Sequence, residues 1–245
     1  MSLIGQIAIV TGAAKGMGRG IAERLAQDGA KIVVCDCDEA GAEETVRCII
    51  AGGNDALAVI GDMRNVADIS KLFQTCNDRF GRPDILVANA GISRGSTLET
   101  ITEEEYYAVH DLNVKGTLFC LKEAAKHLKD GGRIVVISSS TTRFPLEGMA
   151  LYASSKAAQK LMVEVAAQEL ANRGITVNSV MPGLTETPTM LANLPVEFMQ
   201  EVIEASPFKR LGKPQDIAEV VAFLVNKNSQ WVSGQHILVN GGSRF

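Results

Sequence analysis

Tyr152 and Lys156 lie four residues apart in the segment LYASSKAA, at the start of a strongly helical stretch. Residues i and i+4 share one face of a helix, so a phenol and an ammonium group are expected side by side. Free tyrosine has a pKa of about 10, and a nearby fixed cation lowers it by favouring the phenolate. The spacing predicts an acid or base that works nearer neutral pH. Alone, it also describes a solvated helix face beside a packed ring.

Composition limits the classes of protein to which this pair can belong. The chain has 245 residues, of which 46% are hydrophobic, and this suits one α/β domain with a full core. The net charge is −4 and no basic run exceeds two residues, so neither nucleic acid nor a membrane is expected as a partner. The N-terminal segment enters a strand without a signal-peptide layout, which predicts a cytoplasmic protein.

The cysteines indicate reduced thiols rather than a disulfide framework. Their number is odd and none forms a C-x-x-C pair. Cys35 and Cys37 flank Asp36, but no histidine or second cysteine pair completes a metal site, so no metal is predicted.

Short apolar runs alternate with helical patterns along the chain. The alternation predicts a doubly wound α/β fold, with a mostly parallel seven-stranded sheet and helices on both faces. Strands are expected at 6–10, 31–35, 56–60, 84–88, 133–138, 175–180 and 236–240. Helices are expected at 17–28, 39–51, 66–80, 102–128, 153–172 and 214–226.

One long irregular stretch, 182–213, interrupts this alternation. Long loops in compact domains are often functional, so the part at about 184–206 is predicted to be a lid over substrate. Its apolar side chains either cover the substrate or pack on the protein itself, and the sequence leaves both open. These side chains are Leu191, Leu194, Phe198, Met199 and Ile203.

A glycine-rich turn follows the first predicted strand. Gly12, Gly16 and Gly18 let the backbone approach a pyrophosphate at a helix N-terminus. The spacing is G-x-x-x-G-x-G rather than G-x-G-x-x-G, and no G-K-[ST] follows, so this is not a Walker loop.

Acidic residues end the next two strands. Asp36 is placed to accept hydrogen bonds from an adenosine ribose, which favours NAD, although a helix-capping role, which Asp38 fills equally well, is the alternative. Lys15 instead favours NADP, because its ammonium group would meet the 2′-phosphate. Asp62 either accepts from an adenine amino group, with Met63 packed beside it, or caps the helix near 66.

Taken in order, the motifs resemble the short-chain dehydrogenase/reductase family. They are TGAAKGMG (11–18), NAG (89–91), LNVKG (112–116), ISSS (137–140), YASSK (152–156), MPGLTET (181–187) and VNGG (239–242). The resemblance covers essentially the whole chain and implies one Rossmann-like NAD(P)-binding catalytic domain, 1–245. The implied reaction moves a hydride between a nicotinamide and a carbonyl or secondary alcohol.

The resemblance also implies catalytic roles. Tyr152 matches the acid/base, and Lys156 the lysine that lowers its pKa and binds the nicotinamide ribose. Ser139 matches the serine that holds the substrate oxygen, with Ser138 and Ser140 as neighbours that a register error would select. Asn113 matches the asparagine that holds a water of the proton relay; it also fits a helix kink.

The same comparison implies the contacts of the cofactor. Ala88 stands where many relatives have another Asn, but the NAG turn after it is intact. The implied cofactor residues are Gly12, Lys15, Gly16, Met17, Gly18, Asp36, Asp62, Met63, Asn89, Ala90, Gly91, Tyr152, Lys156, Pro182, Gly183, Leu184 and Thr187.

The sequence does not identify the substrate. Walls are expected from 93–96, 141–149 and the lid, and Arg94 or Arg143 would suit an anionic group unless it is simply solvated. A 3-oxoacyl-thioester reductase using NADPH is one alternative, and a non-catalytic nucleotide sensor on the same fold is another. Apolar residues around the predicted helices 102–128 and 153–172 predict a homotetramer, with a dimer as the alternative.

Overall fold

The structure, a computed structural model, describes residues 2–244. Seven strands form one sheet in the order β3-β2-β1-β4-β5-β6-β7, and every neighbouring pair is parallel. The expected mostly parallel sheet is therefore parallel throughout the described strands. The strands are β1 (Ile7–Thr11), β2 (Lys31–Asp36), β3 (Ala56–Ile60), β4 (Ile85–Ala88), β5 (Arg133–Ile137), β6 (Thr176–Pro182) and β7 (His236–Val239).

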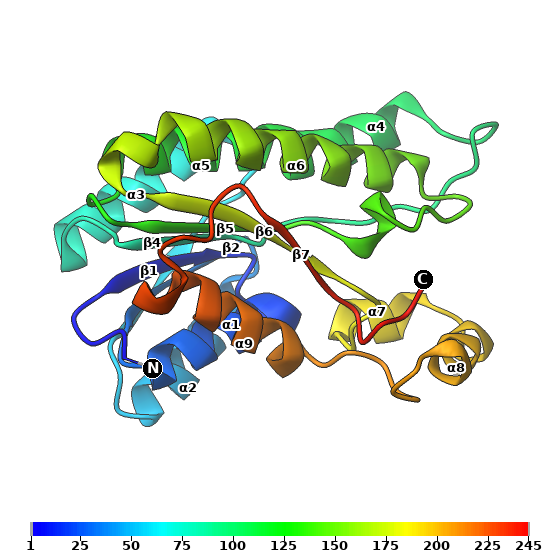
Figure 1. The fold of residues 1–245 in the computed structure, drawn as a ribbon, viewed down its shortest axis with the longest axis horizontal. Coiled ribbons are helices and arrows are strands. Elements are labelled where there is room, and N and C mark those ends of the chain that lie inside the picture. The colour runs from blue at the N-terminus through cyan, green and yellow to red at the C-terminus, as the bar shows by residue number, and fades with distance from the viewer. Residues whose placement is uncertain (1, 245) are drawn as a thin grey trace.

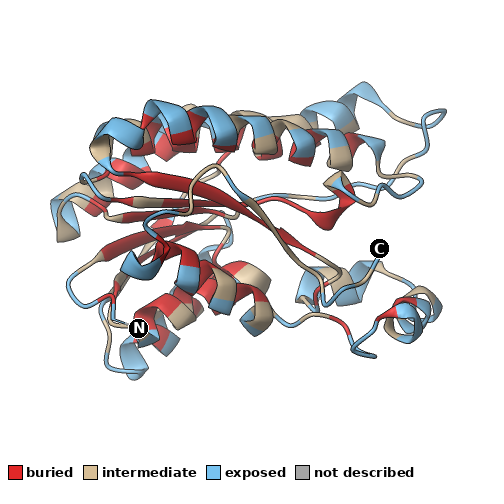
Figure 2. Ribbon diagram, in the orientation of Figure 1, coloured by how far each residue is buried: buried red, intermediate tan, exposed pale blue. Residues whose placement is uncertain are grey.

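Helices cover both faces of the sheet, as the alternating pattern predicts (Figure 1). On one face lie α1 (Gly16–Gln27), α2 (Glu39–Ala51) and α9 (Pro214–Val225). On the other lie α3 (Val66–Phe80), α5 (Thr117–His127) and α6 (Ala150–Glu169). Two apolar cores result, one on each side of the sheet, and Figure 2 shows the buried strands between helices whose outer faces are exposed.

The stretch 102–128 is not the single α-helix that the sequence predicts. It consists of α4 (Glu103–His110), a π-helical segment (Asp111–Gly116) and α5. Thr102 begins α4 with a capping box that includes Glu105. The π-helical segment places one extra residue in the turn, a feature that often marks functional sites, and it carries Asn113.

The segment 184–206 holds two short helices where the sequence analysis expected irregular chain. These are α7 (Pro188–Asn193), capped by the Thr187 hydroxyl at the Met190 amide, and α8 (Val196–Ala205). None of the five apolar residues singled out there is buried, whereas Val202 of α8 is. These side chains therefore have apolar surface left for a ligand.

Two negative findings apply to residues 2–244. No cluster of three or more His, Cys, Asp or Glu side chains suited to a metal is found there. Within the same residues, no helix has the length and apolar character needed to cross a membrane.

Candidate active site

Ser139 and Tyr152 meet at the carboxyl end of β5. Ser139 is the second residue after the strand, and Tyr152 stands in the first turn of α6. The Ser139 hydroxyl lies close enough to the Tyr152 phenol to influence its pKa. Ser139 Oγ also accepts hydrogen bonds from Thr141 Oγ1 at 2.9 Å and from the Thr141 amide at 3.2 Å. With these donors in place, the Ser139 hydroxyl proton is available to a ligand oxygen.

The neighbouring serines point elsewhere. Ser138 Oγ donates to the Lys156 carbonyl at 3.2 Å, so it ties β5 to the backbone of α6. Ser140 is buried at the start of a 3₁₀ turn, Ser140–Thr142. Of the three serines, Ser139 is the one that influences the pKa of Tyr152, in agreement with the role that the resemblance implies.

Lys156 is buried, with 3% of its surface exposed. Its Nζ donates to the Ile137 carbonyl at 2.8 Å and lies 5.7 Å from the centre of the Tyr152 ring. Burial lowers the pKa of Lys156 to about 8. The ammonium group is thus held beneath the site by the end of β5.

The expected lowering of the tyrosine pKa does not appear in this structure. Burial of the phenol raises the pKa of Tyr152, and the neighbouring Ser139 hydroxyl opposes that shift only in part. The expected effect of the lysine charge is outweighed by the cost of burying a phenolate. The Lys156 ammonium, bonded to the Ile137 carbonyl, does not offset this cost.

Asn113 is fully buried, and its side chain is occupied by the protein. Nδ2 donates to the Ile92 carbonyl at 2.9 Å and to Ser155 Oγ at 3.0 Å, while Oδ1 accepts from the Ile92 amide at 2.9 Å. The side chain therefore clamps the loop that follows the NAG turn. The backbone carbonyl of Asn113 accepts from Gln159 Nε2 at 2.7 Å and keeps a second acceptor site that suits a water.

The glycine turn is packed against the other predicted cofactor segments. A side chain at Gly18 would place its Cβ 2.0 Å from the Gly12 carbonyl oxygen, so only glycine fits there. Asn89 Nδ2 donates to the carbonyls of Thr11 and Gly12 at 2.8 and 2.9 Å. A Cβ at Gly16 would lie 3.1 Å from the Thr187 side chain.

This cradle fits a dinucleotide pyrophosphate. The helix α1 begins at Gly16 without a side-chain cap and without an acidic residue in its first turn. Its first amides and the positive end of its dipole are therefore open to an anion. The NAG turn and the residues up to Thr187 border the same place, which brings the segments around 12–18, 89–91 and 182–187 together.

Asp36 supports the glycine turn from β2. Its Oδ2 accepts from the Ala14 amide at 2.9 Å and its Oδ1 from the Asp38 amide at 3.0 Å. Asp38 caps α2 through the Gly41 amide, which answers the capping alternative raised for Asp36. Each carboxylate oxygen of Asp36 keeps a further acceptor site for a ribose hydroxyl.

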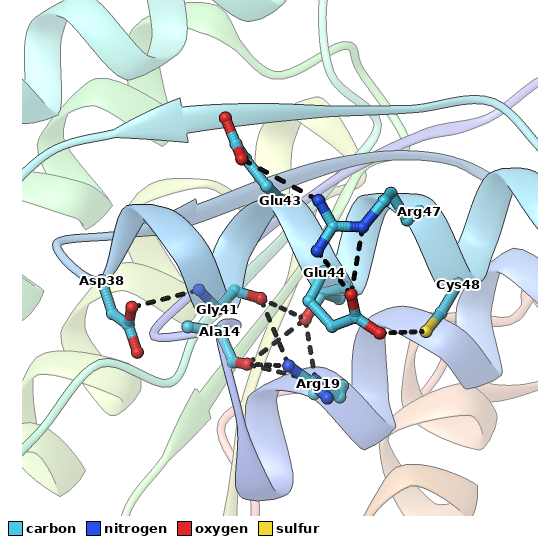
Figure 3. Close-up of polar contacts among 9 residues, drawn as sticks. Ala14, Arg19, Asp38, Gly41, Glu43, Glu44, Arg47 and Cys48 are labelled. Carbon is cyan, nitrogen blue, oxygen red and sulfur yellow. Dashed lines mark hydrogen bonds and ion pairs between the residues drawn. The ribbon is translucent and has the colours of Figure 1, made fainter.

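Arg19 stands close to this corner, but its guanidinium is occupied (Figure 3). Its Nε donates to the Ala14 carbonyl at 3.1 Å and to Thr45 Oγ1 at 2.9 Å, and its Nη2 to the Ala14 carbonyl at 2.6 Å. Lys15, at the N-cap of α1, is exposed. Lys15 is therefore the cation of this turn with freedom to reach a 2′-phosphate.

Two expectations at the end of β3 need correction. Asp62 does not cap α3, because Asn65 does so through the Ala67 amide. Asp62 instead pairs with Arg64 at 2.6 Å, and that guanidinium lowers the pKa of the Asp62 carboxyl. The side chain of Met63 is buried, with its sulfur 3.9 Å from Cys120 Sγ, so it packs in the core rather than beside an adenine.

The last predicted cofactor segment leaves the sheet at Pro182. A Cβ at Gly183 would lie 2.7 Å from that of Asn240, which explains a glycine where β6 and β7 end together. Beyond it, a cavity of about 270 Å³ separates the start of the segment 184–206 from the C-terminal residues. It is lined in part by Leu184, Val202, Ser206, Leu211, Val239 and Asn240.

Three residues that support the site belong to none of the roles predicted from the sequence. Thr141 holds Ser139, Ser155 joins Asn113 to the Tyr152 carbonyl, and Gln159 bonds the Asn113 carbonyl. The signal for Gln159 was a polar residue one helical turn beyond Lys156, on the face that the helix buries. Arg94 and Arg143, the proposed anion contacts, are both exposed.

Comparison with known proteins agrees with the geometry. Residues 12–244 match the family model described as "Enoyl-(Acyl carrier protein) reductase". An uncharacterized oxidoreductase of Methylorubrum extorquens is 40% identical over 99% of both chains. A short-chain dehydrogenase of Burkholderia cenocepacia, solved with NADP, superposes with a TM-score of 0.93 at 36% identity over 99% of both chains.

The chain belongs to the short-chain dehydrogenase/reductase family. A further solved member, the promiscuous reductase LugOII, catalyses keto-reduction at C1 during lugdunomycin biosynthesis; it is 35% identical over the full length of both chains, with a TM-score of 0.93. The protein is accordingly an NAD(P)-dependent oxidoreductase that acts on a carbonyl or secondary alcohol. Its sheet has the Rossmann-like arrangement of this family.

Proposed function

We propose that Ser139, Tyr152 and Lys156 catalyse reversible reduction of a ketone by a nicotinamide dinucleotide. The observation that carries the proposal is the convergence of Ser139, Tyr152 and the buried Lys156 ammonium, whose Nζ lies 5.7 Å from the centre of the Tyr152 ring. A bound cofactor would supply the hydride. All proton chemistry is assigned to the side chains of this chain.

Ser139 and Tyr152 would both donate hydrogen bonds to the substrate oxygen. Two donors at one oxygen stabilise the negative charge that develops as the carbonyl is reduced. Because Thr141 already donates to Ser139 Oγ, the serine proton is directed away from Thr141 and toward the substrate. Tyr152 then transfers its proton to the alkoxide, and oxidation of an alcohol reverses these steps.

Lys156 and Asn113 are proposed to restore the tyrosine proton. The positive charge of Lys156 favours the phenolate that remains after transfer. The Asn113 carbonyl, beside the loop that its side chain clamps, is the proposed acceptor for the water that joins this path to solvent.

We propose that NAD(H) is the preferred cofactor. Asp36 would accept hydrogen bonds from the adenosine ribose and repel a 2′-phosphate. The guanidinium of Arg19, which already bonds Thr45 and Ala14, supports the choice of NAD(H). Lys15 and the NADP bound by the Burkholderia relative favour NADP. The remaining proposed contacts are Gly12, Gly16, Met17, Gly18, Asp62, the Met63 backbone, Asn89, Ala90, Gly91, Pro182, Gly183, Leu184 and Thr187.

We further propose that residues 1–245 form one catalytic domain of a cytoplasmic homotetramer. The segment 184–206 would act as the substrate lid, because its five apolar side chains are not buried and its residues Leu184 and Val202 line the cavity of about 270 Å³. The substrate class favoured is a small or cyclic ketone, in line with the keto-reduction named for LugOII. A 3-oxoacyl thioester is the second substrate to test.

Substitution of the tyrosine tests the catalytic assignment. Tyr152→Phe is expected to abolish turnover and to leave cofactor affinity nearly unchanged, because only the proton donor is lost. Ser139→Ala is expected to lower kcat on the order of 10²-fold, as loss of one oxyanion donor does. Turnover is followed by nicotinamide absorbance with ketones, a 3-oxoacyl thioester and an enoyl thioester.

Ser138→Ala is the matched control, because Ser138 bonds the backbone of α6 instead. A large loss with Ser138→Ala and none with Ser139→Ala would show that the register is wrong. Appreciable turnover by Tyr152→Phe would remove the tyrosine from the mechanism.

Cofactor preference is tested by measuring kcat/KM with NADH and NADPH. We expect a higher value with NADH, and Asp36→Ala should narrow the difference because the carboxylate no longer repels a 2′-phosphate. Lys15→Ala is the companion variant and should reduce only the NADPH value. A wild-type preference for NADPH would mean that Lys15 outweighs Asp36.

A further inference from the structure

Gln159 is a buried amide of α6 that bonds the π-helical segment. Only 1% of its surface is exposed. Its Nε2 donates to the Asn113 carbonyl at 2.7 Å and to Thr117 Oγ1 at 2.8 Å, which uses both amide protons. Its Oε1 is buried and has no hydrogen-bond partner among the described residues.

The first of these bonds compensates for the irregular helix. In a regular α-helix the Thr117 amide would donate to the Asn113 carbonyl, four residues earlier. Here the Thr117 amide is directed to the Val114 carbonyl instead. The Asn113 carbonyl is left without that partner, and the Gln159 amide reaches across from α6 to supply a donor.

Asn113 and Lys156 approach each other next to Gly91. A Cβ built on Gly91 would stand 3.1 Å from Asn113 Oδ1 and 3.2 Å from Lys156 Nζ. A contact that fixes the position of the π-helical segment therefore also fixes Asn113 next to Lys156. Gln159, one helical turn after Lys156 on α6, is placed to do this from the same helix that carries Tyr152.

The unpaired Oε1 indicates a second partner. A buried acceptor without a hydrogen bond costs about 1–3 kcal/mol, and in proteins such atoms are commonly satisfied by buried water. We propose that Gln159 is a positioning residue of the proton path: it holds the Asn113 carbonyl through Nε2 and a buried water through Oε1. This inference rests on the proposed proton transfer through Tyr152 and Lys156.

Three variants separate this role from simple packing. Gln159→Met keeps the side-chain length and removes both polar atoms. We expect kcat for ketone reduction to fall about tenfold, as loss of roughly one hydrogen bond predicts, with a larger solvent deuterium isotope effect and unchanged cofactor affinity. Val163→Ala, a buried apolar residue one turn further along α6, should destabilise the fold without changing the isotope effect.

Gln159→Glu gives a readout that packing cannot produce. A protonated Glu donates to the Asn113 carbonyl, whereas an ionised Glu cannot, and burial raises the pKa of such a carboxyl. The kcat of this variant should therefore fall as pH rises, with a step that is absent from the wild type and from Gln159→Met. The pH profile of Gln159→Glu also tests the proposal if Gln159→Met does not fold.

A crystal structure of the wild-type protein tests the water directly. An ordered water within about 3.2 Å of Oε1 would support the proposal. A wild-type kcat in Gln159→Met, a Gln159→Glu profile that matches the wild type, or an Oε1 without any water would overturn it. Failure of the wild type to reduce any ketone would instead refute the proposed function, and the crystal would still decide the Gln159 contact.

Discussion

The reactive side chains combine proton chemistry with burial, and burial works against the charged form of each. Burial raises the pKa of Tyr152 and lowers that of Lys156 to about 8. The folded protein would therefore be more stable with an uncharged side chain at this position than with a protonated Lys156. The Ile137 carbonyl at 2.8 Å offsets only part of that cost.

Removal of this charge should stabilise the fold. The pKa of Lys156 drops from 10.5 to about 8 on folding, so the penalty is full below pH 8 and fades as pH rises toward 10.5. Lys156→Met is expected to abolish turnover and to raise the free energy of unfolding by about 1–2 kcal/mol at pH 7. The gain should shrink at pH 10.

Urea unfolding at both pH values measures this effect. Lys160→Met, on the next turn of α6 and not fully buried, is the control and should show little difference between the two pH values. A Lys156→Met protein that is less stable than the wild type at pH 7 would contradict the argument.

At the scale of elements, the site depends on turns where backbone segments approach closely. The turn from β1 to α1 brings Gly18 against the Gly12 carbonyl, and Asn89 ties the end of β4 to the same carbonyl. The π-helical segment before α5 holds Asn113 beside the NAG turn. These contacts, rather than the regular helices, set the spacing between the cofactor cradle and Tyr152.

Gly18→Ala should therefore disrupt the cradle. Its Cβ would lie 2.0 Å from the Gly12 carbonyl oxygen, so the turn must shift. We expect loss of cofactor binding and a destabilisation of at least about 2 kcal/mol. Gly95→Ala is the control, because its Cβ would meet nothing closer than 3.9 Å.

Cofactor fluorescence titration and urea unfolding of the two variants measure the outcome. A Gly18→Ala protein with wild-type cofactor affinity would show that the turn tolerates a side chain. That result would also weaken the assignment of this turn to the pyrophosphate.

Elements with one dominant local signal were predictable from the sequence. The apolar runs at 31–35 and 56–60 gave β2 and β3 to within a residue, and the pattern at 66–80 gave α3 with its bounds. The sequence allowed for a helix kink at Asn113 but not for a π-helical segment, because the contacts of Asn113 with Ile92 and Ser155 join distant parts of the chain.

Side-chain environments were the least predictable part of the site. Ser139 could be chosen over its neighbours by its match to the serine of the family, and in the structure it lies beside Tyr152. The pKa direction of Tyr152 was wrong because burial is a property of the folded site. The capping alternative for Asp62 is excluded because Asn65 caps α3, while Asp62 pairs with Arg64.

At the scale of the whole molecule, one helical layer remains incompletely covered. The outer sides of α5 and α6 expose apolar side chains: 48% of Leu118, 64% of Leu161 and 53% of Val165 are accessible. A helix that only covers a sheet needs one apolar stripe, and here the stripe toward the sheet is already buried. A second copy related by a two-fold axis would cover this surface.

The proposed homotetramer can be tested on that surface. Light scattering of the wild type at micromolar concentration should give four chain masses, and the double variant Leu161→Glu, Val165→Glu should give two or one, because charge would be buried at the contact. Ile50→Glu is the matched control: Ile50 is 54% exposed, but it lies on α2, across the sheet. A wild-type dimer that the double variant splits would support this contact alone and exclude the tetramer, whereas a monomeric wild type would exclude both assemblies.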